Sequence, residues 1–230
     1  MREPQAIIFD MDGVLIDSEP IHYEIEKKLF EKLGIVVPEE VHRCYLGASG
    51  DFMYGDLKSR YRLADTVEIL LEQDDLFRCD YFKGLEEIKL NEGVLSLLKE
   101  IKTSGLRMAV ATSSSPEMAA ILLARCGINS LFDSIVTTVE AGKSKPAPDV
   151  YLMAAQKIGV IPANCIVFED SPNGISSAKE AGMFCVAVQT DGVTAQELSK
   201  ADVLVNSFVG LNLQRLFELI ADKCVLQPPN

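Results

Sequence analysis

The side chains best suited to chemistry stand in four short polar groups that lie far apart in the chain. These groups are Asp10-Met11-Asp12-Gly13, Thr112-Ser113-Ser114-Ser115, the segment 142–149 with Lys145, and Glu169-Asp170-Ser171. Carboxylates that are brought close together repel one another unless a cation offsets their charge. Because the four groups contain neither Cys nor His, their oxygen ligands favour a hard cation such as Mg²⁺.

Magnesium held by carboxylates, with hydroxyl and ammonium donors beside it, suits the transfer of a phosphoryl group. Thr112 and the backbone amides at the start of the next helix could hold phosphate oxygens, since a helix N-terminus binds anions. Lys145 could neutralise charge on the transferring group or keep the nucleophile ionised. Lys143 is a rival for this role. Taken singly, each group also has a structural interpretation, as a turn, a helix cap or a solvated loop.

The elements that would bring these groups together follow from the hydrophobic pattern. Short apolar runs that read as buried strands lie at residues 6–9, 107–111, 134–137, 165–168 and 184–188. Helical segments are expected between them at 91–103, 116–126, 148–158 and 172–181. This alternation predicts an α/β fold with a Rossmann-like parallel sheet and helices on both faces. The polar groups would then meet beyond the carboxyl ends of the strands, where ligands bind in such sheets.

Residues 18–86 have a different pattern from the rest of the chain. Ile21, Ile25, Leu29 and Phe30 repeat at helical spacing, and further helical stretches run through 52–61 and 67–77, with no strong strand run. We therefore expect residues 1–17 and 87–230 to form the α/β catalytic core. Residues 18–86 are expected to form an inserted helical-bundle domain.

The motifs resemble those of the haloacid dehalogenase-like superfamily. Its members place Asp-x-Asp-Gly after the first strand, Thr or Ser after the second, then a lysine, then acidic residues after the fourth. The matching residues here are Asp10-Met11-Asp12-Gly13, Thr112-Ser113, Lys145 within Lys-Pro-Ala-Pro-Asp, and Glu169-Asp170-Ser171. The resemblance implies that the helical insert is a cap domain, as in the subgroup that includes β-phosphoglucomutase and many sugar-phosphate phosphatases.

The resemblance also implies roles for these residues. Asp10 would be the nucleophile that forms an aspartyl-phosphate, and Asp12 would be the general acid and then the general base. Asp10, Asp170 and the backbone carbonyl of Asp12 would bind Mg²⁺, with Glu169 as a direct ligand or a more distant contributor. Thr112 and Lys145 complete the predicted catalytic set.

Three further residues are candidates for substrate binding. Ser113 follows Thr112 in the matched motif. His22 lies one turn beyond Ser18 and could reach a site beneath the cap, although a lone His on an amphipathic helix is also a common structural residue. Gly47 lies in Leu46-Gly47-Ala48-Ser49-Gly50, which looks like the substrate-reading cap loop of this subgroup. A simple helix–helix connection explains that segment nearly as well.

Three functions are open, and we favour hydrolysis of a small phosphorylated metabolite, such as a sugar phosphate or a nucleotide-derived phosphate. A β-phosphoglucomutase-type mutase is the alternative, but it needs basic groups to hold a second phosphate. The corresponding positions here are Leu46, Gly50 and Ser115. A phosphate-accepting receiver-like module is the third interpretation, and it would have no need of a lid over its aspartate.

Composition limits the partners. The 230-residue chain has a formal net charge of -12, which argues against nucleic-acid binding because that function needs a dense basic surface. No apolar run is long enough for a signal peptide or a membrane span. The six cysteines are widely spaced, which argues against a zinc site or a disulfide framework. We expect a cytoplasmic monomer with no membrane partner.

Overall fold

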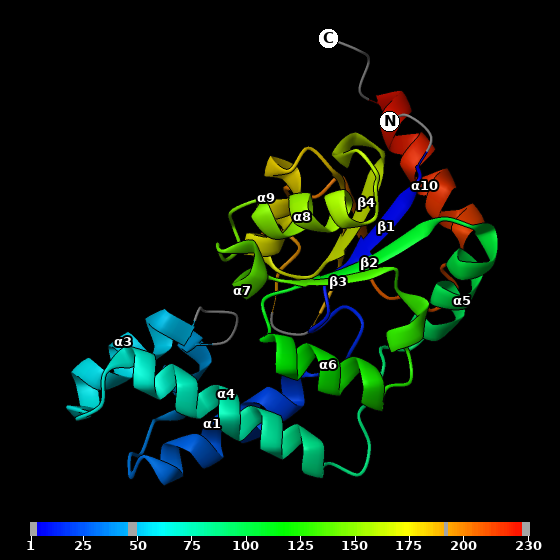
Figure 1. Ribbon diagram of the computed structural model, residues 1–230. Helices are drawn as coiled ribbons and strands as arrows, with labels where there is room; N and C mark the ends of the chain where they lie inside the picture. The colour runs from blue at the N-terminus through cyan, green and yellow to red at the C-terminus, as the bar shows by residue number, and fades with distance from the viewer. Residues whose placement is uncertain (1–3, 46–49, 191–192, 227–230) are drawn as a thin grey trace. The chain divides into compact units, whose positions relative to one another are not determined.

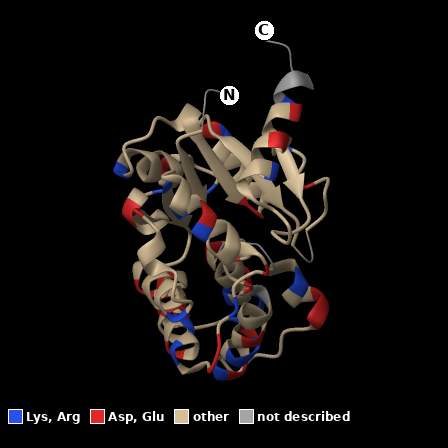
Figure 2. Ribbon diagram, turned by 90° about the vertical axis from the view of Figure 1, so that its right-hand side faces the viewer, with Lys and Arg blue, Asp and Glu red and all other residues tan. Residues whose placement is uncertain are grey.

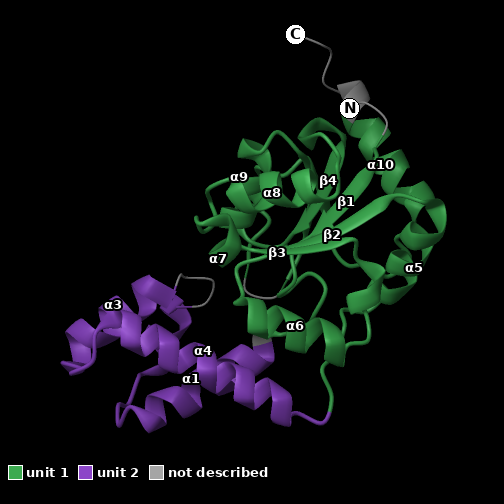
Figure 3. Ribbon diagram, viewed as in Figure 1, with its two compact units in different colours: residues 1–18, 87–230 green, residues 19–86 purple. Residues whose placement is uncertain are grey.

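The computed structural model describes residues 4–45, 50–190 and 193–226 of the chain. The chain divides into two compact units, which are coloured separately in Figure 3. Unit 1 consists of residues 1–18 and 87–230, and unit 2 consists of residues 19–86. The sequence placed the first boundary after Asp17, whereas Ser18 belongs to unit 1 in the structure.

Unit 1 contains a six-stranded sheet in its described residues, and every strand in it is parallel to its neighbours (Figure 1). The spatial order is β3-β2-β1-β4-β5-β6. The strands are β1 (Ala6–Phe9), β2 (Arg107–Thr112), β3 (Ser134–Thr137), β4 (Cys165–Glu169), β5 (Phe184–Val188) and β6 (Val203–Val205). The predicted Rossmann-like α/β fold is therefore confirmed.

The strands are apolar on both faces because helices cover both sides of the sheet. Figure 1 shows α5 (Val94–Ser104) and α10 (Leu213–Leu226) on one side of the sheet, and α8 (Asp149–Lys157) and α9 (Pro172–Glu180) on the other. Charged residues accordingly lie mainly on helices and loops (Figure 2). Within the strands of the described chain, only Arg107 and Glu169 carry charge.

The remaining elements of unit 1 are short, apart from α6. They are α6 (Pro116–Arg125), α7 (Thr138–Ala141) and the 3₁₀ segments η2 (Asn129–Leu131) and η3 (Pro162–Asn164). As expected from its sequence, α6 begins with Ser115 as its cap: the Ser115 hydroxyl accepts a hydrogen bond from the Met118 amide at 3.3 Å.

Four elements of unit 1 differ from the prediction: α5 begins later, and α7, β6 and α10 are additional. Helix α5 begins at Val94 rather than Asn91, because Gly93 has the left-handed φ of 89° and cannot continue a helix. Strand β6 and helix α10 were not predicted. Strand β6 has only three residues, which is too short for a periodic signal.

Unit 2 consists of helices and their connecting loops, with no strand in its described residues. It contains α1 (Glu19–Lys32), α2 (Glu39–His42), the 3₁₀ segment η1 (Arg43–Tyr45), α3 (Gly50–Tyr61) and α4 (Val67–Gly84). The unit has a hydrophobic core of its own, formed by Phe30, Tyr45, Met53, Tyr54, Leu57 and Leu70. Across both units, no helix in the described residues is both long and apolar enough to cross a membrane.

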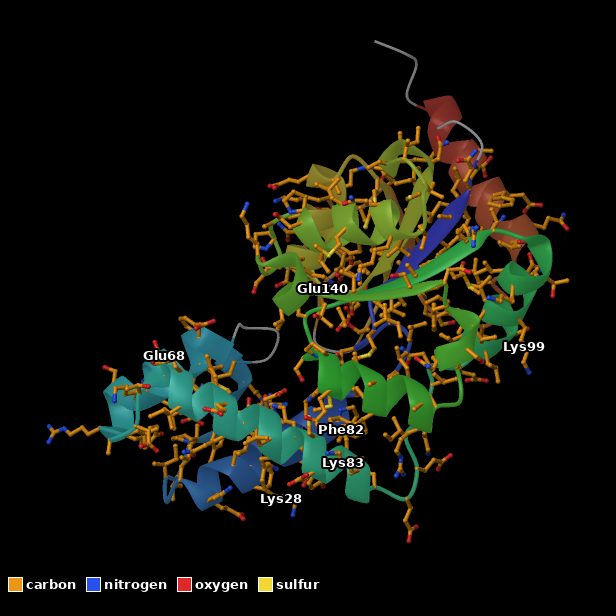
Figure 4. All side chains as sticks on the ribbon, in the orientation of Figure 1. Lys28, Glu68, Phe82, Lys83, Lys99 and Glu140 are labelled. Atoms are coloured by element: carbon orange, nitrogen blue, oxygen red, sulfur yellow. The ribbon has the colours of Figure 1, made fainter. Side chains whose placement is uncertain are left out.

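A cluster of ionic side chains links α1 to α4 inside unit 2. Arg78 donates hydrogen bonds to Asp74 at 2.7 Å and to Glu26 at 3.2 Å. The Arg78 Nη1 atom also lies 2.7 Å from Nδ1 of His22, whose ring meets Phe82 edge-on with centroids 5.5 Å apart. Phe82 is completely buried, whereas its neighbour Lys83 is half-exposed; both are labelled on α4 in Figure 4.

The two chain segments that connect the units are joined to each other within unit 1. The Asp17 amide donates to the Lys89 carbonyl at 3.1 Å. The Asn91 side-chain amide donates to the carbonyls of Gly13 at 2.6 Å and Val14 at 2.8 Å. Asn91 therefore ties the returning segment to the loop that follows β1.

Replacing Asn91 should test how firmly that loop is held. We expect Asn91→Ala to lower the free energy of unfolding by about 1–3 kcal/mol, because two carbonyls in a partly buried loop lose their donor. Urea denaturation would measure the change. Glu92→Ala is the matched control, since Glu92 is exposed on the same turn and its loss should leave stability nearly unchanged. Equal stability of the two variants would contradict this role for Asn91.

Candidate active site

The parallel sheet brings the first and fourth polar groups side by side. In the sheet, Phe9 is paired with Phe168, so that Asp10 and Glu169 follow at the same level on neighbouring strands. The Asp10 amide donates to the Phe168 carbonyl at 3.0 Å, which extends the pairing by one residue. Strands β1 and β4 lie where the strand order reverses, which is the usual ligand position in an open α/β sheet.

The Lys145 ammonium joins these two strand ends. Its Nζ atom lies 2.5 Å from Oδ1 of Asp10 and 2.6 Å from Oε1 of Glu169. It also donates to the Ala111 carbonyl near the end of β2, at 3.2 Å. Lys143, the rival in the sequence, instead forms an exposed ion pair with Asp149 at 3.4 Å. The structure therefore places Lys145, and not Lys143, against the predicted nucleophile.

Both carboxylate oxygens of Glu169 are occupied by hydrogen bonds within the protein. Oε1 accepts from Lys145 and from the Tyr151 hydroxyl, the latter at 2.8 Å. Oε2 accepts from the Asp170 amide at 2.9 Å and from the amide and hydroxyl of Ser171, each at 3.0 Å. Glu169 is fully buried, and these contacts compensate its charge.

Gly174 on α9 makes room for the Glu169 side chain. A Cβ atom at residue 174 would lie 1.6 Å from Oε1 of Glu169, far inside contact distance. The helix therefore approaches this carboxylate so closely that only glycine fits at that position.

Burial and neighbouring charges shift the pKa values of Asp10, Glu169 and Lys145 in different ways. Burial raises the pKa of Asp10 to about 8; Lys145 opposes this, and the negative charges of Glu169 and Asp12 add to it. Burial alone would also raise the pKa of Glu169, but Lys145 and the hydrogen-bond donors around the carboxylate hold that pKa below its ordinary value. For Lys145, burial favours the neutral amine, but Asp10 and Glu169 outweigh it and raise the pKa. Lys145 thus remains charged, and a further cation beside Asp10 would favour its ionised form.

Asp12 has a more open environment than Asp10. Its side chain is half-buried, and its two oxygens accept hydrogen bonds from Ser18 at 2.8 Å and from Ser114 at 2.7 Å. Because a hydroxyl group can rotate, it can donate to a carboxylate and can also accept from the O–H of a carboxylic acid. The two aspartates of the motif therefore have distinct environments, as two carboxylates with separate roles require.

Asp170 lies directly against the Asp12-Gly13 turn. Gly13 has a φ of 76°, and a Cβ atom there would lie 2.0 Å from Oδ2 of Asp170. The carboxylates of Asp10 and Asp170, with the main-chain carbonyl of Asp12, are the oxygen donors that suit Mg²⁺. No set of three or more His, Cys, Asp or Glu side chains is assembled as a metal site in the described residues, so a metal here would rely on that carbonyl and on water or substrate oxygens.

Thr112 ends β2 and is buried, and its hydroxyl accepts a hydrogen bond from the Ser114 amide at 3.0 Å. Ser113, the predicted substrate contact, is exposed. The other two predicted substrate contacts belong to residues 19–86. His22 is part of the ionic cluster of unit 2, and Gly47 lies outside the described residues.

Three residues of this arrangement were not predicted. Tyr151 resembles an ordinary apolar position of an amphipathic helix, so the sequence carried no signal for its role. Ser114 belongs to the polar segment Thr112-Ser113-Ser114-Ser115, but the sequence pointed to Thr112 and Ser113 as the site residues of that segment. Ser18 was placed in the insert, although its hydroxyl contacts Asp12.

The chain is similar to known proteins over most of its length. Residues 7–188 match the family model of haloacid dehalogenase-like hydrolases. A phosphorylated carbohydrates phosphatase of Thermotoga maritima is 32% identical over 179 residues, which are 78% of this chain and 82% of that protein. A β-phosphoglucomutase of Bacillus subtilis is 30% identical over 220 residues, which are 93% of this chain and 94% of that protein.

The solved structures show the same fold. The crystal structure of CbbY from Rhodobacter sphaeroides in complex with phosphate has a TM-score of 0.82 and 28% identity, and the match covers 93% of this chain and 99% of that one. The chain therefore belongs to the haloacid dehalogenase-like hydrolase family. Within that family it is an enzyme of the phosphatase class, as the sequence predicted.

Filling the space at Gly174 should damage the site specifically. In Gly174→Ala the new methyl group displaces Glu169, and Lys145 loses one of its two carboxylate partners. We expect a loss of about 1–3 kcal/mol in the free energy of unfolding from overpacking, together with a large loss of turnover.

Gly55→Ala is the matched control for this substitution. Gly55 lies inside α3, and a Cβ atom there meets nothing within 4 Å. Alanine at this position should leave stability unchanged or raise it slightly. Thermal melting and a phosphate-release assay on both variants would measure the effects, and a fully active, equally stable Gly174→Ala protein would contradict the packing described.

Proposed function

We propose that the protein is a Mg²⁺-dependent phosphomonoesterase that acts on a small phosphorylated carbohydrate through an aspartyl-phosphate on Asp10. The observation that carries this proposal is the placement of Asp10, which is buried at a strand end and held by the Lys145 ammonium 2.5 Å away. Asp12, two residues on, stands in a more open environment with two hydroxyl partners. A nucleophile and a proton-transfer group with different surroundings are what such a reaction requires.

The reaction would proceed in two displacements. An oxygen of Asp10 attacks the phosphorus atom, the ester P–O bond breaks, and Asp12 gives its proton to the departing alcohol oxygen. Water then attacks the phosphorus of the aspartyl-phosphate, and Asp12 takes a proton from that water. The second step releases inorganic phosphate and restores both aspartates, so the sum is hydrolysis of one phosphate ester.

Lys145 and Thr112 would support these steps. The charge of Lys145 would offset the charge on the phosphoryl oxygens while the ammonium stays anchored to Glu169. The Thr112 oxygen already accepts from the Ser114 amide, which turns its hydroxyl hydrogen toward another acceptor, such as a phosphate oxygen. The exposed Ser113, at the start of the same loop, would contact the substrate.

The metal would be held by Asp10, Asp170 and the main-chain carbonyl of Asp12. When bound there, Mg²⁺ would supply positive charge that offsets repulsion between the carboxylates and the anionic substrate. Glu169 would not be a direct ligand, because both of its oxygens are occupied by five donors of the protein itself. We assign it instead to the anchoring of Lys145.

We infer that unit 2 is the cap domain that the family resemblance implies, and we keep His22 and Gly47 as its proposed substrate contacts. Two connecting segments joined by the Asp17–Lys89 hydrogen bond suit a hinged lid. The protein would act in the cytoplasm, and the cysteines whose side chains are described, all free thiols, suit a reducing compartment.

A mutase is the second candidate, since the β-phosphoglucomutase of Bacillus subtilis is 30% identical to this chain. Hydrolysis is favoured because one of the positions where a mutase would need a basic group is Ser115, and the Ser115 hydroxyl already caps α6. A receiver-like module is disfavoured by the inserted helical unit of residues 19–86.

A metabolite screen tests the proposal. With Mg²⁺, the purified protein should release phosphate catalytically from at least one phosphorylated sugar in a broad panel, and chelation of the metal should stop the release. Asp10→Asn should lower kcat by roughly a thousandfold or more, because the nucleophile is lost, while the melting temperature stays within a few degrees.

Two results would contradict this function. Interconversion of glucose 1-phosphate and glucose 6-phosphate without phosphate release from any substrate would favour the mutase. A single stable phosphorylation without turnover would favour the receiver-like module. Retained activity in Asp10→Asn would refute the assignment of the nucleophile.

A further inference from the structure

Tyr151 is a buried residue whose hydroxyl group points into the active site. It lies in the first turns of α8 and is completely buried, as are its neighbours Val150 and Ala154 on the same helix. Its ring therefore belongs to the core of unit 1. Its hydroxyl, in contrast, donates to Oε1 of Glu169 at 2.8 Å.

The same hydroxyl also contacts the catalytic lysine. The Lys145 Nζ atom lies 3.2 Å from the Tyr151 oxygen and 4.9 Å from the centre of its ring. Lys145, Glu169 and Tyr151 thus form a closed triangle in which each member contacts the other two. The hydroxyl gives its only proton to Glu169 and presents a lone pair to the ammonium.

The Lys145 ammonium has more acceptors around it than it has N–H bonds. An ammonium group has three N–H bonds, but four oxygens lie within 3.2 Å of Nζ: those of Asp10, Glu169, Ala111 and Tyr151. The two carboxylate oxygens, at 2.5 and 2.6 Å, compete most strongly for these N–H groups, whereas the Tyr151 oxygen at 3.2 Å is a weak acceptor. By satisfying Oε1 of Glu169 with a second donor, Tyr151 weakens the pull of that carboxylate on Lys145.

We propose that Tyr151 is a positioning residue that keeps the Lys145 ammonium against Asp10. Without the hydroxyl, Lys145 would be the sole donor to Oε1 of Glu169, and a small gap would open beside the ammonium. Both changes draw Nζ toward Glu169 and away from the nucleophile and the phosphoryl oxygens. This inference rests on the proposed function for its effect on turnover, but not for its effect on the position of Lys145.

Tyr151→Phe tests the proposal because it removes one oxygen and keeps the ring. We expect kcat to fall by about threefold to tenfold, the size of one net hydrogen bond, while KM stays within about twofold. Tyr54→Phe, which removes the hydroxyl of a second buried tyrosine in α3 of unit 2, is the matched control and should keep the wild-type kcat. A kcat of Tyr151→Phe within twofold of wild type would overturn the proposal.

A double-mutant cycle separates positioning from packing. If Tyr151 acts through Glu169, adding Tyr151→Phe to Glu169→Gln should lower kcat little further. Losses that multiply would overturn the proposal. If Tyr151→Phe does not fold, a chain with 4-aminophenylalanine at position 151 should restore kcat, because that residue keeps a donor at the same ring position. Failure of this rescue in a folded protein would also overturn the proposal.

Crystal structures provide a measurement that does not depend on activity. In Tyr151→Phe, the distance from Lys145 Nζ to Asp10 Oδ1 should increase beyond hydrogen-bond range, about 3.2 Å. An unchanged Lys145 position would overturn the inference. Absence of phosphate release by the wild-type protein would instead refute the proposed function, and the crystal structures would still decide the role of Tyr151.

Discussion

A buried ammonium group holds together the parts of this active site that come from different strands. Lys145 contacts Asp10 beyond β1, Glu169 at the end of β4 and the Ala111 carbonyl near the end of β2. Two buried carboxylates on neighbouring parallel strands would repel each other and take up protons without a charge between them. Lys145 holds the pKa of Glu169 below its ordinary value and opposes the rise that burial causes in the pKa of Asp10. In our proposal, the donors around Glu169 determine how closely that charge is held to Asp10, the proposed nucleophile.

The backbone contributes as much to the site as the charged side chains do. Parallel pairing of Phe9 with Phe168 sets Asp10 beside Glu169. Two glycines permit close approach: Gly13 leaves room for Asp170, and Gly174 leaves room for Glu169. Asn91 then fixes the loop after β1 by binding two of its carbonyls. Four of the carboxylates in the acidic excess of the chain stand at one edge of the sheet, where the proposed site lies.

The sequence predicted those parts of the fold for which a residue pattern is compatible with only one structure. Alternating apolar runs and helical segments predicted the parallel sheet, and the order of the motifs predicted which strand ends carry the polar groups. The orientation of Glu169 could not be predicted, because a carboxylate at that position can face either a metal or a lysine. Tyr151 was missed because its ring satisfies the helical core pattern, while its proposed role depends on one oxygen. The contact between Ser114 and Asp12 joins residues 102 positions apart, beyond the reach of any local pattern.

Chemical trapping of the intermediate is the most direct measurement of the central claim, that Asp10 accepts the phosphoryl group. Borohydride added during steady turnover reduces an acyl phosphate to an alcohol, so an aspartyl-phosphate is recovered as homoserine and can be located by peptide mass spectrometry. The structure predicts homoserine at position 10, and only while substrate is being consumed. Active turnover with residue 10 recovered entirely as aspartate, or with the reduced residue elsewhere, would contradict it.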